Sequence, residues 1–370
     1  MYLRKIFPTF LSMCSLIALS ESTPIAAEGY YESESCFSTP ACCDMPYGVY
    51  VSGEYLYWKA VQDQMQYAMI LPGGIQQIIQ SIDPSGPVQI EEKLRIVDPS
   101  FKYNSGFRVA LGYEIPCSNW DFQIAWTRLH ENVSSCVFNE DQGVIPLTLP
   151  ASSIFGFITA SSPADFAFGD SASSRWKFEF DAIDAEVGRL FSFLGCLNFR
   201  PYIGVKAASI RQTQQVQFAG FFVGDIPVGL RNTKKNDFRG IGPSLGLDST
   251  WEFYSGWSLS SGVSGAILCG EFDVHEKASV TVDPNFIHVD LKNSKKWRVR
   301  PTVAANIGID WTTSFWDSFQ MMLGVSYEAQ YWWNQWQVPP SITGSIVTGG
   351  ASPQGDLSMQ GLTARLAVLF

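Results

Sequence analysis

Side chains alternate strictly in character over the last ten residues of the chain, 361–370. One face would carry Leu362, Ala364, Leu366, Val368 and Phe370, and the other Thr363, Arg365 and Ala367. A period of two is that of a β-strand. A strand with one apolar face and one charged face is typical of a membrane barrel, where lipid lies on one side and water on the other. A buried edge strand of a soluble sheet would show the same period, so this segment alone leaves both structures open.

The same alternation recurs in nine further segments, 49–58, 106–115, 120–126, 180–193, 199–211, 239–251, 257–269, 297–311 and 319–331. It is clearest over 297–311, although Pro301 lacks the backbone donor that a central strand needs. Strands of about 10 residues, tilted near 45°, cross an apolar band about 25 Å tall. Aromatic residues near their ends would then form the two interfacial girdles of a barrel, or the core of a soluble sandwich: Trp120, Trp251, Trp257, Trp297, Trp311 and Tyr331.

The connections between these segments alternate in length. Short ones cover 116–119, 194–198, 252–256 and 312–317, and long ones cover 70–105, 130–175, 212–238, 270–296 and 332–360. This alternation predicts an all-β fold: a transmembrane antiparallel up-and-down β-barrel over 48–370, with short periplasmic turns and long external loops. Structureless loops longer than about 15 residues are uncommon, so the long connections are expected to hide hairpins. Alternation over 89–96 suggests one such strand, and we predict an even strand number of about 16, within a range of 10–16.

The amino terminus has the pattern of a targeting segment. Arg4 and Lys5 precede a short apolar stretch over 6–19. This predicts a signal peptide over 1–27, cleaved between 20 and 27, followed by a cysteine-containing segment over 28–47. After it no apolar run is long enough for a transmembrane helix. The net charge of -10 argues against nucleic acid as a partner.

An exported chain can form disulfides. The candidates are Cys36, Cys42, Cys43, Cys117, Cys136, Cys196 and Cys269. Their odd number leaves at least one free thiol or one intermolecular bridge. The first three lie close together, but they lack a second cysteine pair and a nearby histidine, so we predict no metal site and no cofactor.

Short motifs resemble a known family. They are Gly-Glu-Tyr-Leu-Tyr-Trp at 53–58, Arg-Pro-Tyr-Ile-Gly-Val-Lys-Ala-Ala at 200–208, and the terminal Phe370. Together they are similar to the chlamydial and Legionella-type major outer membrane proteins. The resemblance implies a porin in the outer membrane of a Gram-negative, Chlamydia-related bacterium. It also implies disulfide-linked envelope proteins as partners. The terminal Phe370 matches the carboxy-terminal signature of bacterial outer-membrane barrels, so we expect barrel assembly machinery to recognise it. Outer-membrane lipid and further copies of the chain complete the expected partners.

The polar faces of the predicted strands would line the barrel interior. Their charged residues are Arg108, Glu114, Asp121, Asp184, Glu186, Arg200, Lys206, Asp248, Glu252, Arg298, Arg300, Asp310, Glu328 and Arg365. Charge on facing walls orders water and sorts ions, which predicts passive diffusion of ions and small hydrophilic solutes. The same charges could instead pair within a plugged interior.

Two other functions have weaker sequence support. Hydrolysis would need a histidine held between a nucleophile and an acid. His130, His275 and His288 offer no such motif, so we expect no enzyme activity. The long external connections and the surplus cysteine would suit a surface adhesin or a disulfide-linked structural envelope protein, which remains the alternative to a porin.

Overall fold

A computed structural model describes residues 48–70, 95–115, 118–139, 143–147, 169–193, 196–223, 226–282, 285–292, 295–315, 319–337 and 354–370. No helix in these ranges is long and apolar enough to cross a bilayer. The predicted signal peptide and the segment 28–47 lie outside the described residues, and both stay predictions.

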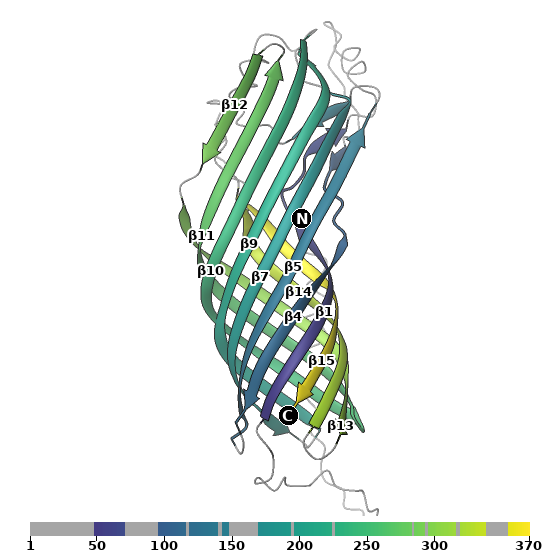
Figure 1. The fold of residues 1–370 in the computed structure, drawn as a ribbon, viewed down its shortest axis with the longest axis vertical. Helices are drawn as coiled ribbons and strands as arrows, with labels where there is room; N and C mark the ends of the chain where they lie inside the picture. The colour runs from purple at the N-terminus through teal and green to yellow at the C-terminus, as the bar shows by residue number, and fades with distance from the viewer. Residues whose placement is uncertain are drawn as a thin grey trace, which may run out of the picture. The chain divides into compact units, whose positions relative to one another are not determined.

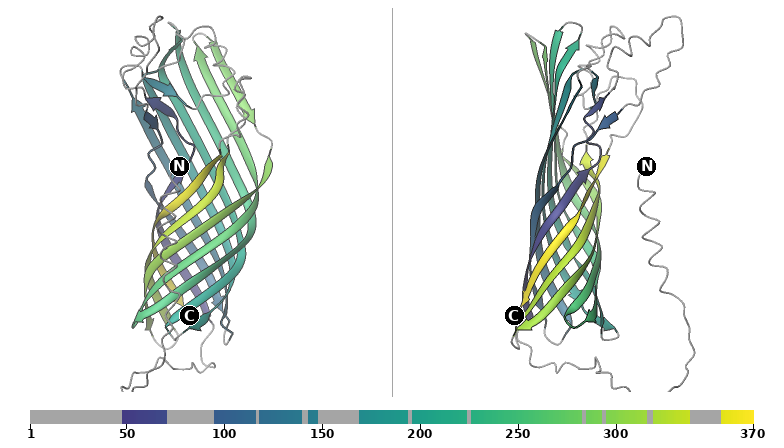
Figure 2. Two further views of the ribbon diagram at one scale, coloured as in Figure 1. Left: turned by 180° about the vertical axis from the view of Figure 1, so that it is seen from behind. Right: turned by 90° about the vertical axis from the view of Figure 1, so that its right-hand side faces the viewer.

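Ten described strands form one closed antiparallel ring. In ring order they are β1 (Gly48–Gln62), β4 (Tyr103–Glu114), β5 (Trp120–Phe138), β7 (Ser171–Arg189), β9 (Leu197–Val223), β10 (Ile226–Tyr254), β11 (Trp257–Val282), β13 (Lys296–Phe315), β14 (Phe319–Gln337) and β15 (Gln354–Leu369). The ladder between β1 and β15 closes the ring. Figures 1 and 2 show the strands crossing the barrel at a tilt. Two short strands, β8 (Phe191–Phe193) and β12 (Asn285–Lys292), add to β9 and β11 outside it.

All ten predicted strands are present, and β13 continues through Pro301 without a register shift. The described ring has ten strands, the lower limit of the expected range of 10–16, and not the expected number of about 16, because most of the long connections continue the strands. β9 and β10 fill nearly all of 212–238, and β10 reaches 29 residues where about 10 were expected. The extra strand expected near 89–96 is described only as β3 (Arg95–Val97), which does not join the ring.

One wall of the barrel is much taller than the other. β5, β7, β9, β10 and β11 extend past the ends of β1 and β13–β15, at the end opposite the carboxy terminus (Figure 1). The short turns lie at the same end as Phe370, next to the start of β1. Because outer-membrane barrels have short turns in the periplasm, the tall wall is placed on the external side.

The inner face of the tall wall is covered by a small sheet. β2 (Ala68–Ile70) pairs with β3 and with β6 (Val144–Pro146). Tyr67, Ala68 and Val144 pack against inward residues of the wall, namely Ala172, Val216, Phe218 and Leu230. This contact buries apolar surface that the single wall would otherwise expose to water.

The outward face of the ring is apolar near the carboxy-terminal end and charged beyond it. Large apolar side chains stand exposed there, for example Ile203 at 71% and Leu245 at 67%. Farther along the tall wall the outward residues are mostly polar and include Arg, Lys, Asp and Glu. An apolar surface of this extent is unfavourable in water and matches a lipid-facing band. Five of the residues expected on the lipid face are exposed there, namely Val303, Ile307, Leu323, Val325 and Leu366, whereas Val368 is only partly exposed.

We predict that a lysine in place of Ile307 destabilises the barrel much more than a lysine in place of its neighbour Asn306. Ile307 is 56% exposed on the outward face, whereas Asn306 lines the interior. Ile307→Lys should lower the free energy of unfolding in lipid vesicles by about 2–4 kcal/mol, and Asn306→Lys by clearly less, since only the first places a charge in hydrocarbon. Urea unfolding of both variants measures the difference. Equal losses would contradict the assignment of the two faces.

Candidate functional site

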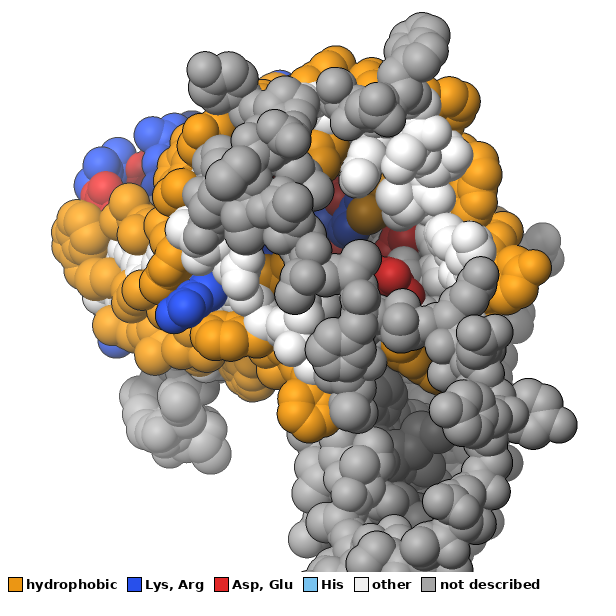
Figure 3. All heavy atoms as spheres, turned by 90° about the horizontal axis from the view of Figure 1, so that it is seen from below, with side chains coloured by type: hydrophobic (Ala, Val, Ile, Leu, Met, Phe, Trp, Pro, Cys, Tyr) orange, Lys and Arg blue, Asp and Glu red, His pale blue; other side chains and the backbone are white. Residues whose placement is uncertain are grey.

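The candidate site is a charged cavity inside the lower part of the ring. Its volume is about 790 Å³, and inward side chains from all ten ring strands line it. Asn119 from the turn after β4, and Phe370, also line it, so it reaches the end where the short turns lie. Figure 3 looks toward that end, with acidic and basic side chains inside the ring and hydrophobic ones outside.

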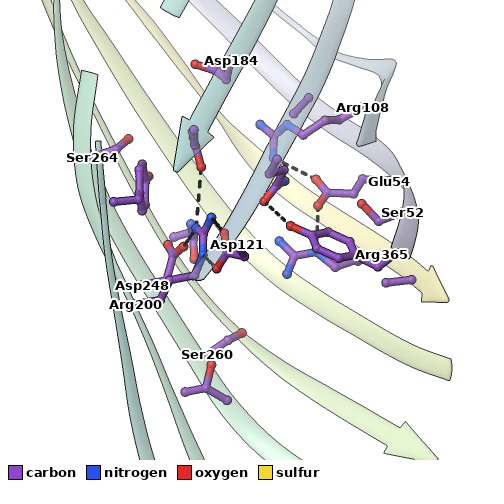
Figure 4. Close-up of a pocket in the computed structure, with 18 of the residues that line it drawn as sticks. Ser52, Glu54, Arg108, Asp121, Asp184, Arg200, Asp248, Ser260, Ser264 and Arg365 are labelled. Carbon is purple, nitrogen blue, oxygen red and sulfur yellow. Dashed lines mark hydrogen bonds and ion pairs between the residues drawn. The ribbon is translucent and has the colours of Figure 1, made fainter. Parts of the chain in front are cut away.

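Arg108 on β4 organises one half of the cavity. Its Nη1 lies 2.8 Å from Glu54 Oε2, and its Nη2 lies 2.9 Å from Glu328 Oε1. Glu54 also accepts a hydrogen bond of 2.7 Å from Nε of Arg365. Bonds between charged groups of this length are among the stronger hydrogen bonds in proteins. The network joins β1, β4, β14 and β15 from inside the barrel (Figure 4).

Arg200 on β9 organises the other half. Its Nε donates to Asp121 Oδ2 at 2.7 Å, and its Nη1 donates to Asp248 Oδ2 at 2.9 Å. Gly188 leaves the space for this side chain, because a Cβ there would lie 2.6 Å from Arg200 Nε. Lys206 Nζ pairs with Asp184 at 2.7 Å nearby. Each cation of the cavity therefore lies within reach of a carboxylate.

Carboxylates outnumber cations in the lining of the cavity. Eight acidic residues, Glu54, Glu114, Asp121, Asp184, Glu186, Asp248, Asp310 and Glu328, face four basic ones, Arg108, Arg200, Lys206 and Arg365. The surplus of acidic groups makes the cavity a better environment for cations than for anions.

An aromatic layer closes the external end of the cavity. We define it by Trp58, Phe178, Phe180, Trp332 and their fully buried neighbours Leu56, Leu268, Leu357 and Met359. The rings of Phe180 and Trp332 meet edge to face with centroids 5.5 Å apart. Their strands, β7 and β14, lie five places apart in a ring of ten. Opposite walls of the barrel are therefore in direct contact across the lumen.

Two strand ends fold inward and complete the closure. β14 shifts register between Trp332 and Trp336, and Asn334 adopts a left-handed conformation with a φ of 52°. Asn236 Nδ2 on β10 then donates to the Gln335 carbonyl at 3.1 Å. At the end of β1, Gln62 Oε1 accepts a bond of 2.9 Å from Gln212 on β9. In the described residues the cavity is thus blind on the external side.

Eleven of the fourteen charged residues singled out in the sequence line the cavity. Glu252 lies exposed at the periplasmic end of β10, outside the lining. Arg298 is exposed at the external end of β13. Arg300 is 7% exposed and packs over the ring of Phe272 at 5.0 Å, beyond the cavity. Glu54 also lines the cavity and is not among the fourteen, although its place between Gly53 and Tyr55 on an alternating strand could have indicated it. Whether the eleven line a conducting pore stays a prediction.

The other candidate residues lie apart from this cavity. His130 and His275 stand on the outward face, with Nε2 atoms 3.9 Å from Asp181 and 3.1 Å from Asp273. The described residues contain no group of three or more ligands suited to a metal.

Cys136 and Cys269 carry free, exposed thiols, and Cys196 lies in the turn before β9. Cys36, Cys42, Cys43 and Cys117 are outside the described residues.

Phe370, the expected assembly signal, is 52% exposed and contacts the ring of Phe319 with centroids 5.6 Å apart. Its backbone N–H donates to the Val49 carbonyl at 2.9 Å. Its recognition by assembly machinery stays a prediction.

We predict that Arg108→Gln will lower the free energy of unfolding by about 3–5 kcal/mol, because it leaves Glu54 and Glu328 buried with fewer partners. Their side chains are only 5% and 7% exposed. The double variant Arg108→Gln, Glu328→Gln should recover part of the loss, as measured by urea unfolding in vesicles. A loss below about 1 kcal/mol for the single variant would show instead that water screens the ion pairs of Arg108 as it screens ion pairs at a protein surface.

Comparison with solved structures gives weak likenesses. The outer membrane protease OmpT from Escherichia coli shows 8% identity over 89% of this chain and 100% of that chain, with a TM-score of 0.39. A FadL homologue from Pseudomonas aeruginosa shows 8% identity over 89% and 93%, with a TM-score of 0.27. The toluene transporter TodX from Pseudomonas putida shows 8% identity over 90% and 93%, with a TM-score of 0.21. At these scores the likeness carries no information on function.

Comparison of sequences is more informative. No curated protein matches the chain. The family model of the Legionella pneumophila major outer membrane protein precursor matches residues 42–370, which is most of the chain. The narrower expectation of a Chlamydia-related source stays a prediction. The chain belongs to the Legionella major outer membrane protein family, and is an outer-membrane β-barrel protein of a Gram-negative bacterium.

Proposed function

We propose that this barrel is a gated diffusion channel for small ions and small hydrophilic solutes. The charged cavity of about 790 Å³, built from every strand of the ring, carries the proposal. A barrel that served only as an anchor could fill this space with apolar side chains, which would avoid the desolvation of so many charges. A wet, charged lumen instead suits the passage of hydrated ions. The channel needs no cofactor and no chemistry.

The channel is closed in the conformation described. Contact between Phe180 and Trp332 leaves no room for a hydrated ion between the two walls. Opening therefore requires the aromatic layer to separate. The inward-folded end of β14 is the element best placed to move, because beyond its register shift only two pairs, Trp336↔Gly355 and Gln337↔Gln354, continue its ladder with β15.

A scaffold or adhesin is the second candidate. The observation that favours it is the tall wall, whose outward face beyond the apolar band presents a broad polar surface. A scaffold or adhesin does not need an open lumen, so the closed conformation is compatible with this role. The two functions differ in whether current passes through the folded barrel.

We predict that Trp332→Ala will raise the size or frequency of conductance steps in a planar bilayer above those of the unchanged protein. Trp332 is fully buried in the aromatic layer, and its truncation removes the contact with Phe180. Trp333→Ala is the matched control, since Trp333 contacts Tyr331 on the other face of β14. This control should leave the conductance steps unchanged.

Phe180→Leu provides a milder change to the same contact. A change in gel mobility on heating verifies that each variant is folded. If folded protein and all variants pass no current, the channel is excluded and the scaffold is favoured.

We also predict that the open variant prefers cations, because acidic groups exceed basic groups in the lining. The reversal potential in a potassium chloride gradient measures this preference. Glu114→Gln with Glu186→Gln should weaken it, as both carboxylates line the cavity. Glu252→Gln removes the same charge from an exposed position outside the lining and should have no effect. A preference for anions would contradict the charge argument but not the channel.

A further inference from the structure

The charge on the outer face of the tall wall changes with distance from the apolar band. The two rows of paired outward residues next to the band begin at Arg128 and His130 on β5. Across β5, β7, β9, β10 and β11 these two rows contain five acidic residues and three arginines. The next three rows begin at Asn132, Ser134 and Cys136, and on the same strands they contain five Arg or Lys and no acidic residue. The outer face is therefore basic only at a distance from the membrane.

Two of these five bases lack an acidic partner. The other three each have an acidic neighbour: Lys177 has Glu179, Lys277 has Asp290 on β12, and Lys235 has Asp237 two residues away. Arg175 on β7 and Arg231 on β10 are both exposed, and neither forms an ion pair within the described residues. An exposed base without a counter-charge attracts anions from the medium.

Arg175 lies in a groove on this face. The groove lies between β5, β7 and β9, has a volume of about 280 Å³, and has Arg175 as the only charged residue among the described residues that line it. Most of the others carry hydroxyl or amide groups, for example Ser134 and Ser173. The amide oxygen of Gln217, which also lines the groove, accepts bonds of 2.8 Å from Nη2 and 2.9 Å from Nε of Arg231. Arg231 is therefore held beside the groove, and its guanidinium retains donors for another acceptor.

The composition of this surface favours a saccharide over other polyanions. The described outward residues of the three basic rows include no Phe, Tyr or Trp on which nucleic acid bases could stack. They also include no Leu, Ile, Val or Met, which would anchor a peptide. The Ser, Thr, Asn and Gln side chains of these rows instead donate and accept hydrogen bonds, as the hydroxyl groups of a saccharide do.

The spacing of the two arginines favours a chain over a single small anion. β9 lies between β7 and β10, so Arg175 and Arg231 are two strand spacings, or roughly 10 Å, apart. The planar fork of each guanidinium matches the two oxygens of a carboxylate. A ligand that satisfies both arginines therefore carries acidic groups at more than one position along its length.

We propose that this surface binds acidic saccharide chains presented from the external medium, with Arg175 and Arg231 on their acidic groups and one sugar in the groove. Ser134, which pairs with Arg175, lies eight residues beyond the outward Trp126 of the apolar band, or about 26 Å along the strand. This distance favours a ligand outside the membrane over a lipid headgroup. The proposal applies to a channel and to a scaffold alike, because the surface lies outside the charged cavity.

The test uses the full barrel in phosphatidylcholine nanodiscs, which contain no acidic lipid, and isothermal titration with a hexamer of galacturonic acid. We expect saturable binding that weakens as the salt concentration rises, because salt screens exposed charges. Arg175→Gln with Arg231→Gln should lower the affinity roughly tenfold, since each exposed ion contact is individually weak. The methyl-esterified hexamer presents the same sugars without charge and should not bind.

The matched control is Arg128→Gln with Arg239→Gln, which removes the same charge from the same face but in the row next to the apolar band. This control should retain the affinity of the unchanged protein, and a change in gel mobility on heating verifies that both double variants are folded. Equal losses in the two double variants would overturn the proposal in favour of unspecific attraction. Equal affinity for a hexamer of glutamic acid or of single-stranded DNA would overturn the choice of a saccharide. Absence of binding to the galacturonate hexamer would overturn the proposal outright.

Discussion

The ladder between β1 and β15 is the constraint on which the rest of the structure depends. In hydrocarbon every backbone N–H and C=O must find a partner, so the first and last strands have to pair. They do so without a break from Tyr50↔Leu369 to Gln62↔Leu357. Closure at ten strands limits the width of the interior. That width is small enough for Phe180 and Trp332 to touch from opposite walls, at 5.5 Å between ring centroids. A ring of sixteen strands would hold these side chains apart.

The sequence predicts the strands because each one alternates within the membrane band, where lipid requires apolar outward residues. The sequence does not, however, predict how long the strands are. Beyond the band, β9 continues with Gln212, Gln214, Gln215 and Gln217, which are polar on both faces and look like a loop. The structure shows that Gln212 and Gln214 face inward and bond to Gln62 and to the Met65 carbonyl. Side-chain partners far away in sequence stabilise this extension, and no local pattern reveals them.

The charged cavity could be predicted from alternation, whereas the aromatic layer could not, because the apolar face of a strand changes sides at the edge of the membrane band. In β7 the outward residues Ile183 and Val187 are apolar and the inward Asp184 and Glu186 are charged. Farther out the inward Trp176, Phe178 and Phe180 are buried, and the outward Lys177, Glu179 and Asp181 are charged. The period of two is unbroken throughout. Whether the apolar or the charged face of a strand points into the barrel depends on the position of the bilayer edge, and the alternation itself does not give that position.

This reversal links the closed lumen to the tall wall. Inside the band, lipid covers the outer face and water can fill the interior. Outside it, water surrounds the wall, so the apolar side chains must collect on the inner face and pack against whatever folds over them. The ends of β1 and β14 and the small sheet provide that cover. Separating Trp332 from Phe180 would expose this apolar surface, at a cost of roughly 25 cal/mol for each Å². On the proposed function the closed channel is therefore the resting state, and opening requires an interaction that compensates for this exposure.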